Sequence, residues 1–417
     1  MACEVSLQSL LATLIAISVA NNGNGSAQVA GRCIAYVRPA TRIPSALLHV
    51  VPMPAWEQRK LSEVATFGGG HTPPMADPDN YEDGYVLWVT SQDVKSNYLD
   101  RTTTQITEKG AKELTLYPAG SLVMVTRSGI LRHTLPVAEL RKPSTVNQDI
   151  RVILPQGECC GEWLLQFFIS HNKELLLEFG KTGTTVESVD FGKIKDMLLY
   201  MPSTVEQQQI GDFFAKLDSL ITLHQRKYDK LVILKKSMLE KMFPKDGESV
   251  PEIRFAGFTD PWEQRKFSEI VDVCSGRDYK HLDGGPIPVY GTGGYMTSVS
   301  EALSHNRDAI GIGRKGTIDK PYLLKAPFWT VDTLFYAIPK SDINLEFALC
   351  SFSNVDWKSK DESTGLPSLS KESINETVLS VPNVVEQNHL GSFFADLDRL
   401  ITLHQRKYDK LVILKKS

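Results

Sequence analysis

Residues 205–237 read VEQQQIGDFFAKLDSLITLHQRKYDKLVILKKS, and residues 385–417 read VEQNHLGSFFADLDRLITLHQRKYDKLVILKKS. Six of these 33 positions differ, so 27 are identical. A shorter repeat precedes each copy, because WEQRK stands at 56–60 and again at 262–266. The sequence between each WEQRK and its long copy is unlike in the two halves. The chain is therefore an internal repeat in which two constant frames surround two different inserts.

The repeated stretch predicts one long helix in each half. In the first copy, apolar residues recur at alternating spacings of four and three, which is the a/d pattern of a coiled coil. An apolar stripe of this length needs a partner, and we expect the two copies to pair with each other. The alternative is that each packs on its own domain or on another chain. The predicted helix–helix interface comprises Phe214, Leu217, Ile221, Tyr228 and Leu231 in the first copy and Phe394, Leu397, Ile401, Tyr408 and Leu411 in the second.

The starts of the two helices are marked in the sequence. Ser203 stands three residues before Glu206, which predicts a capping box. Asn383 and Glu386 repeat the signal with a different cap, and Pro244 stops the first helix. These signals predict a central helix at 203–243, a linker at 244–261 and a distal helix at 383–417 that is truncated relative to the first.

The inserts at 54–202 and 262–382 have the composition of α+β domains. Short β-rich runs lie between Gly and Pro residues, and apolar helical patches follow them. Both inserts carry a Thr-Gly pair and a Leu-x-x-Pro that ends at Pro202 or Pro382, so we expect one fold in two versions. The expected strands include 85–89, 121–125, 150–154 and 309–312, and the expected helices include 163–168 and 345–352.

Composition adds few constraints. The 417 residues carry 46 Lys and Arg against 49 Asp and Glu, a net charge of −3, so any binding of nucleic acid would depend on local basic patches. Residues 1–53 form an atypical leader that we interpret as mistranslated or disordered: their apolar run is too short to span a bilayer, and no Lys or Arg precedes Arg32. The six cysteines form no C-x-x-C, which is typical of free thiols in a reducing cytoplasm.

Taken together, the ordered elements resemble a known family. They are WEQRK, the Thr-Gly pair, L-x-x-P followed by x-x-x-E-Q, and the helix FFAKLDSLITLHQRKYDKLVILKKS. This pattern is similar to the specificity subunit of type I restriction-modification systems, and the resemblance covers about 54–417. It implies two globular target recognition domains, separated by two long helices that pair as an antiparallel coiled coil with pseudo-two-fold symmetry.

The resemblance also implies a function and partners. Each domain would read one half of a bipartite, asymmetric site in double-stranded DNA, and the helix pair would fix the spacer. Two methyltransferase subunits and nuclease-translocase subunits would assemble on the chain in the cytoplasm. This chain would be a non-catalytic subunit without a cofactor of its own, while S-adenosylmethionine, ATP and Mg would bind the partner subunits.

Candidate DNA-binding residues are donors on loops that follow strands, because Arg and Lys contact phosphates and guanine, and Asn and Gln read adenine. The alternative for each is a solvated loop. Tyr290 is an aromatic that could instead pack in the core. The candidates are Arg127, Arg132, His133, Lys142 and Gln148 in the first domain, and Arg277, Lys280, Arg314, Lys315 and Tyr290 in the second.

Two other classes of function fit less well. A coiled-coil adaptor with two protein-binding modules would explain the helices but not why the inserts differ while the frame does not. An independent enzyme is disfavoured, because the sequence completes neither a G-x-G-x-x-G nor a G-x-x-x-x-G-K-[ST] motif. His224 and His404 lie within the two apolar stripes, where a hydrogen-bonded histidine is far more common than a metal ligand, so no metal site is predicted.

Overall fold

The computed structural model describes residues 56–182, 186–245 and 247–416. The expected leader at 1–53 lies outside these ranges. All elements below belong to the unit formed by residues 57–417.

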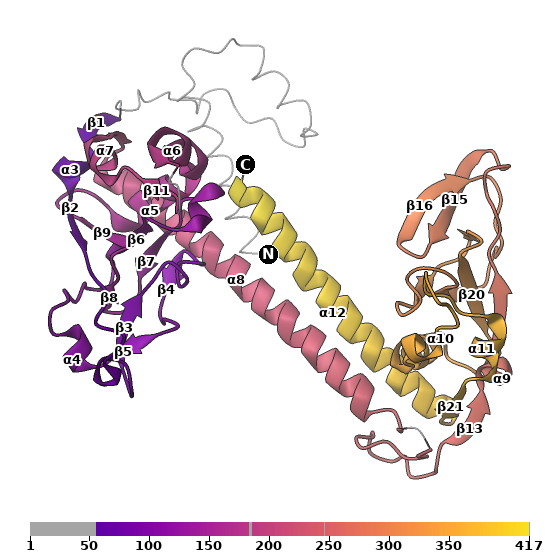
Figure 1. Ribbon diagram of the computed structural model, residues 1–417. Coiled ribbons are helices and arrows are strands. Elements are labelled where there is room, and N and C mark those ends of the chain that lie inside the picture. The colour runs from indigo at the N-terminus through magenta and orange to yellow at the C-terminus, as the bar shows by residue number, and fades with distance from the viewer. Residues whose placement is uncertain (1–55, 183–185, 246, 417) are drawn as a thin grey trace. The chain divides into compact units, whose positions relative to one another are not determined.

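The two repeated stretches form the long helices α8 (Thr204–Lys241) and α12 (Val384–Lys416), which run side by side in opposite directions (Figure 1). At 1.5 Å per residue, α8 is about 57 Å long. Two ion pairs fix the antiparallel register: Lys235 Nζ lies 2.6 Å from Asp398 Oδ1, and Lys415 pairs with Asp218. The two lysines, Lys235 and Lys415, lie 180 positions apart in the sequence, and so do the two aspartates, Asp218 and Asp398. The predicted antiparallel pairing is confirmed, and the pairs are related by an internal pseudo-two-fold axis.

The first insert forms mixed sheets with helices packed against them. β1 (Glu57–Lys60) pairs antiparallel with β12 (Leu198–Met201), so WEQRK joins the strand that leads into α8. The strands of one larger sheet lie in the order β2-β9-β6-β7-β4, and those of a smaller sheet in the order β5-β3-β8. Their bounds are β2 Ala65–Gly69, β3 Val86–Val89, β4 Tyr98–Leu99, β5 Gln105–Ile106, β6 Leu122–Val125, β7 Val137–Leu140, β8 Thr145–Val146 and β9 Ile150–Pro155, and β10 (Gly180–Lys181) pairs with β11 (Ser188–Val189). The helices are α3 Leu61–Val64, α4 Glu108–Ala111, α5 Gly161–Ser170, α6 Asn172–Phe179 and α7 Phe191–Asp196, with 3-10 turns η3 Pro78–Asn80 and η4 Gly129–Arg132.

The second insert repeats this plan. β13 (Glu263–Lys266) pairs antiparallel with β21 (Val378–Val381), the larger sheet has the order β14-β20-β17-β18, and the smaller has the order β16-β15-β19. The bounds are β14 Val271–Ser275, β15 Gly284–Gly291, β16 Gly294–Val299, β17 Ala309–Gly313, β18 Tyr322–Leu324, β19 Trp329–Thr330 and β20 Leu334–Pro339, with α9 Phe267–Ile270, α10 Leu345–Asn354, α11 Lys371–Glu376 and η5 Trp357–Lys360.

Strand order shows that the two inserts share one fold. The order β2-β9-β6-β7 in the first half matches β14-β20-β17-β18 in the second. In each smaller sheet, one parallel pair occupies the same place, β3 with β8 and β15 with β19. Two sequences that differ almost throughout therefore build the same α+β scaffold twice, as the shared landmarks predicted.

Each domain is attached to the start of its own long helix by the same buried glutamine. Gln207 Oε1 accepts a hydrogen bond from Cys160 N at 2.9 Å, and its Nε2 donates to Pro202 O at 2.9 Å. Gln387 makes the equivalent bonds with Asn344 N at 3.0 Å and Pro382 O at 3.0 Å. An amide side chain can accept and donate at once, so one residue joins the domain, the strand end and the helix.

The predicted interface residues lie along the seam with different degrees of burial. Leu231 packs against the core cluster that contains Phe394 and Leu397, so residues of both helices meet there. Leu217, Phe394 and Leu397 are buried, and the half-buried ones are Phe214, Ile221, Tyr228, Leu231, Ile401, Tyr408 and Leu411.

The capping boxes form only in part. Ser203 Oγ accepts from Glu206 N at 3.4 Å, and Asn383 Oδ1 accepts from Glu386 N at 3.0 Å, so both cap residues act as predicted. The reciprocal bond from the glutamate side chain is missing at the described start of α8, where one oxygen of Glu206 is buried without a hydrogen-bond partner. At α12, the Glu386 carboxylate binds Arg254 instead.

Candidate nucleic-acid interface

Strand register brings three chain segments of the first domain to one edge of its larger sheet. β2 ends at Gly69 opposite Arg151, and β6 ends at Val125 opposite Ile150. The chain therefore leaves β2 and β6, and enters β9, at the same edge. We call the polar residues gathered there, Arg127, Gln148, Arg151 and Thr72, the first basic edge.

Arg127, Gln148 and Arg151 of the first basic edge are exposed, Thr72 is half-buried, and contacts hold part of the group in place. Thr72 Oγ1 donates to Gln148 Oε1 at 2.6 Å, across 76 residues of chain. The guanidinium of Arg151 lies against Gly69, where a Cβ would collide with it. The backbone of Arg127 forms a bridge with Ser188, which fixes the loop after β6. Thr72 and Arg151 were not predicted, because only the register of β2 with β9 places them beside Arg127 and Gln148.

Arg132 and His133 stand at the end of η4, next to this edge. Arg132 forms an ion pair with Glu187 and holds the pKa of that carboxyl below its usual range. The second oxygen of Glu187 is buried without a hydrogen-bond partner in the described chain. The exposed Arg132 is thus paired with a carboxylate of its own domain, whereas Arg127 has no ion-pair partner among the described residues.

Lys142 is not brought to the first basic edge. It follows Leu140, the last residue of β7, whereas the other candidates follow β6 or precede β9. Because β7 runs antiparallel to β6, its end lies at the opposite edge of the sheet. Lys142 therefore lies apart from the first basic edge, and its contact with DNA stays a prediction.

The second domain has an equivalent edge. β17 ends at Gly313 opposite Leu334, and β14 ends at Ser275 opposite Phe335. The loops that follow both strands meet residues 330–333, because Arg277 N donates to Thr330 O at 2.9 Å and Arg314 N donates to Thr333 O at 2.8 Å. We call Arg277, Arg314 and Lys315 the second basic edge; all three are exposed.

The remaining candidates of the second domain have different environments. Lys280 is exposed in the turn after Arg277. The ring of the half-buried Tyr290 lies 6.3 Å from the ring of the exposed Tyr295 and 6.2 Å from that of the half-buried Tyr322, measured between centroids. Tyr322 donates to Gly291 O at 2.6 Å, and burial raises the pKa of its hydroxyl. Tyr290 therefore supports the loop next to the second basic edge rather than standing free on it.

The two edges present different side chains at equivalent backbone positions. Lys315 bridges Ser368 as Arg127 bridges Ser188, and these serines lie 180 residues apart. Arg314 and Thr126, which precede Lys315 and Arg127, are also equivalent. Arg314 O accepts a hydrogen bond from Leu369 N, and Thr126 O accepts one from Val189 N. The second edge therefore has an arginine where the first has a buried threonine, Thr126.

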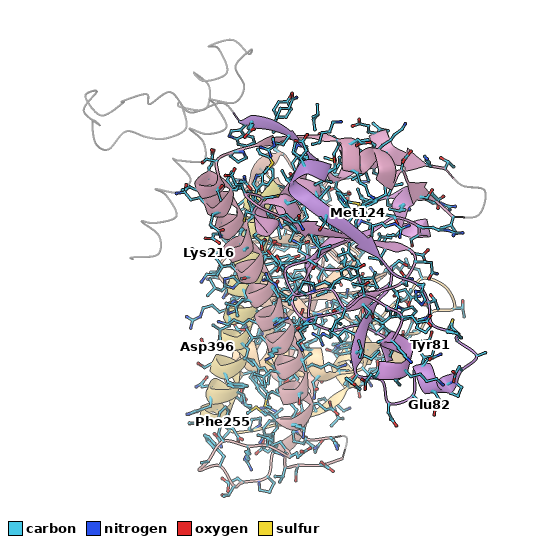
Figure 2. The ribbon with its side chains drawn as sticks, turned by 90° about the vertical axis from the view of Figure 1, so that its left-hand side faces the viewer. Tyr81, Glu82, Met124, Lys216, Phe255 and Asp396 are labelled. Carbon is cyan, nitrogen blue, oxygen red and sulfur yellow. The ribbon has the colours of Figure 1, made fainter. Side chains whose placement is uncertain are left out.

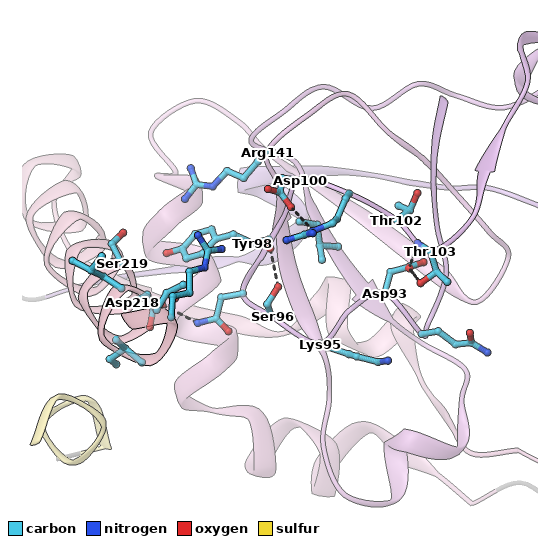
Figure 3. A pocket seen from close by; sticks show the side chains of 18 residues that line it. Asp93, Lys95, Ser96, Tyr98, Asp100, Thr102, Thr103, Arg141, Asp218 and Ser219 are labelled. Carbon is cyan, nitrogen blue, oxygen red and sulfur yellow. Dashed lines mark hydrogen bonds and ion pairs between the residues drawn. The ribbon is translucent and has the colours of Figure 1, made fainter. Parts of the chain in front are cut away.

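A polar network joins the first domain to the helix pair beside an open cleft of about 1010 Å³ (Figure 3). Asn97 Nδ2 donates to Asp218 Oδ2 at 2.8 Å, and the same carboxylate pairs with Lys415 of the other long helix. Tyr98 donates to a Glu162 carboxylate oxygen at 2.6 Å, and burial raises the pKa of its hydroxyl. Asp218 of α8 therefore contacts both the first domain and α12, so the position of the first domain is coupled to the helix register.

His224 and His404 meet near the middle of the helix pair, with their Nδ1 atoms 2.8 Å apart. Such a contact needs one protonated and one unprotonated nitrogen. Burial is the main cause that lowers the pKa of both imidazoles. The charge of His404 is the next largest cause that lowers the pKa of His224. The ammonium groups of Lys227 and Lys407 lower both pKa values further.

We expect the stability of the helix pair to fall as the pH falls through the range just below the ordinary histidine pKa of about 6.5. The unfolded chain binds more protons than the folded chain in that range, so protonation favours unfolding. The urea midpoint should be lower at about pH 5.5 than at about pH 7.5. A double variant, His224→Gln with His404→Gln, should show a flatter pH profile; an unchanged profile would assign the effect to other groups.

The described residues contain no group of three or more His, Cys, Asp or Glu side chains placed to hold a metal ion. Among the helices described, none is both long and apolar enough to cross a membrane.

The chain resembles proteins of one kind in sequence. It is 29% identical over 186 residues to the type I restriction enzyme EcoR124I/EcoR124II specificity subunit of Escherichia coli, covering 42% of this chain and 46% of that protein. It is 28% identical over 236 residues to the MjaIX specificity subunit of Methanocaldococcus jannaschii, covering 53% and 52%. The chain thus spans about half the length of the curated relatives it matches.

A solved structure of the same kind of protein has a similar fold. The crystal structure of a type I restriction-modification S subunit from M. genitalium superposes with a TM-score of 0.59 at 15% identity, covering 86% of this chain and 94% of that one. A family model described as the type I restriction modification DNA specificity domain matches residues 53–232 and again 259–412. These two matches cover most of the sequence, so the chain belongs to the family of type I restriction-modification specificity proteins and carries two copies of its DNA specificity domain.

Proposed function

We propose that this chain is the DNA-reading subunit of a type I restriction-modification complex and performs no catalysis itself. Residues 54–202 and 262–382 are its two target recognition domains, and the helices at 203–243 and 383–417 set the spacer between two half-sites. The observation that carries the proposal is one fold built twice with different exposed side chains at equivalent edge positions: Arg127 stands against Lys315, and the exposed Arg314 has only the buried Thr126 as its counterpart. Different sets of donors recognise different bases, so the site is asymmetric.

Basic edges suit DNA because loop cations contact phosphates while neighbouring polar groups reach base edges. At the first edge, Arg127 and Arg151 supply charge, and Gln148 supplies an amide that can pair with adenine. At the second, Arg277, Arg314 and Lys315 supply three cations within one group of loops. An adaptor that binds only proteins gives no reason for these exposed cations at the same edge of both domains.

The partners we propose are two methyltransferase subunits, joined by nuclease-translocase subunits that use ATP and Mg. S-adenosylmethionine would bind the methyltransferases, and the complex would act in the cytoplasm. The helix pair supports two equal partners because it exposes the same apolar side chains twice. Leu223 and Ile233 are 44% and 68% exposed, and their equivalents Leu403 and Ile413 are 43% and 66% exposed. Repeated exposed apolar residues mark sites of association.

The test is footprinting of genomic DNA by the purified chain with its methyltransferase partner. We expect protection of one split site, with affinity that falls steeply as salt rises because phosphate contacts release counterions. Exchanging residues 262–382 for the insert of another family member should change one half-site and leave the other intact. Equal protection of all sequences would contradict DNA reading, and a change in both half-sites would contradict the division into two readers.

A further inference from the structure

One segment of the first domain has no counterpart in the described part of the second. β3 and β5 correspond to β15 and β16, because each pair is antiparallel and its first strand also pairs in parallel, with β8 or with β19. Residues 90–104 connect β3 to β5, whereas residues 292–293 connect β15 to β16. We call residues 90–104 the arm. The arm contains β4, which adds a fifth strand to the larger sheet, where the second domain has four.

Hydrogen bonds hold the arm in one shape. Asp93 closes its base: one carboxylate oxygen accepts from the amide and the hydroxyl of Thr90, both at 2.8 Å, and the other accepts from those of Thr103 at 2.7 and 2.6 Å. Next to β4, Glu139 N of β7 donates to Asn97 O at 2.8 Å. The arm is therefore joined to the larger sheet and moves with its domain.

The arm contacts the helix pair at a buried aspartate (Figure 3). Asp218 of α8 is 8% exposed, and its Oδ2 accepts a hydrogen bond from Asn97 Nδ2 of the arm at 2.8 Å. The same oxygen accepts from Gln166 Nε2 of α5 at 3.5 Å, and Lys415 of α12 pairs with the other oxygen. A buried carboxylate depends on such donors, so the loss of one of them is costly.

The equivalent aspartate of α12 makes the ion pair between the helices without an arm. Figure 2 labels Lys216 of α8 and Asp396 of α12, which stand two residues before Asp218 and Asp398. Asp398 accepts from Lys235 at 2.6 and 2.7 Å, and its side chain is 45% exposed, against 10% for Asp218. The same ion pair thus occurs twice, and among the described residues the arm joins a domain to one copy only.

We infer that Asn97 and Asp218 are positioning residues that select the spacer: through the arm, they hold the first domain at one distance and one rotation from the second. This inference rests on the proposed DNA-reading function. One base pair adds about 3.4 Å and about 35° of rotation between two half-sites. A hydrogen bond persists over only about 0.5 Å of donor–acceptor distance. The first domain therefore cannot follow a spacer change of one base pair without breaking the bond between Asn97 and Asp218.

The test measures binding of the full chain, with its methyltransferase partner, to DNA duplexes that carry the footprinted site with its own spacer or with one base pair added or removed. The wild-type complex should prefer its own spacer by roughly 30-fold or more, as for a mismatch within a half-site. Asn97→Ala and Asp218→Asn should each reduce that preference roughly tenfold, because each breaks the contact within one network. Unfolded protein lowers the apparent affinity for all duplexes equally, so the ratio between spacers reports position and not stability.

Two matched variants separate the arm from other effects. Gln92→Ala removes an exposed amide from the same arm, and Asp398→Asn weakens the equivalent ion pair between the helices; both should keep the wild-type preference. A preference that Asn97→Ala leaves intact, or that Asp398→Asn reduces as much as Asp218→Asn does, would overturn the positioning role and leave DNA reading in place. A wild-type complex that prefers no site would overturn both.

Discussion

Removing the two adjacent cations of the second basic edge, Arg314→Ala with Lys315→Ala, is expected to weaken specific binding strongly at physiological salt. A base-reading or phosphate-bound arginine or lysine contributes about 1–3 kcal/mol, so the pair should cost about 2–4 kcal/mol, or roughly 30- to 1,000-fold in affinity. The salt dependence should also become shallower, by about one unit of slope for each lost phosphate contact. Binding isotherms at several salt concentrations measure both effects.

The matched control removes one arginine and one lysine from the opposite edge of the same domain. Arg307 precedes β17 and donates to Pro339 O at 2.8 Å, and Lys325 follows Leu324, which pairs with Ala309 at the start of β17; both are exposed. Arg307→Ala with Lys325→Ala changes net charge by the same amount, so it should lower affinity by less than about threefold. Equal losses in the two double variants would mean that the domain attracts DNA by its total charge and not by this edge.

Much of the architecture was predictable because the signals are local. Apolar spacing and cap residues predict the two long helices, and β-rich runs predict β6, β9 and β17 within a residue or two. The fold class follows from the repeat, since two copies of one helix with complementary stripes need each other. These signals act over a few residues and do not depend on how distant segments pair.

Membership of the basic edges was less predictable because it depends on register. Arg151 reaches the first edge only because it pairs with Gly69, 82 residues earlier in the chain, and Thr72 only because it contacts Gln148. Lys142 lies close to Gln148 in sequence but follows a strand that runs the other way. Arg132 has the right residue type, but its charge is used by Glu187, and no local pattern predicts that partner.

Identical sequence in the two helices also does not give identical environments. Phe214 and Phe394 stand in the same FFA triplet, yet Phe394 is 1% exposed and Phe214 is half-buried. The difference arises because Met242 and Phe243, just after α8, pack into the core of the second half. The Phe243 ring lies 6.1 Å from Phe394 and 5.7 Å from both Phe347 and Trp262.

We therefore expect Phe394→Ala to be the more damaging member of a matched pair. Truncating a fully buried phenylalanine costs about 3–5 kcal/mol, because it removes apolar contacts and leaves a cavity. Phe214→Ala removes the same atoms from the same helix position but from a half-solvated site, so it should cost about 1 kcal/mol. Urea unfolding of both variants, followed by tryptophan fluorescence and by circular dichroism, measures the difference.

The comparison isolates the environment, because helix propensity, sequence context and the deleted atoms are the same at both positions. A cavity among Phe243, Phe347 and Trp262 would also loosen the contact between the end of α8 and the second domain. The Phe394→Ala protein should therefore lose protection from hydrogen exchange at residues 239–243 before it unfolds globally. Equal losses of stability in the two variants would show that the seam between the helices, and not the packing of Phe243 into the second core, holds this phenylalanine in place.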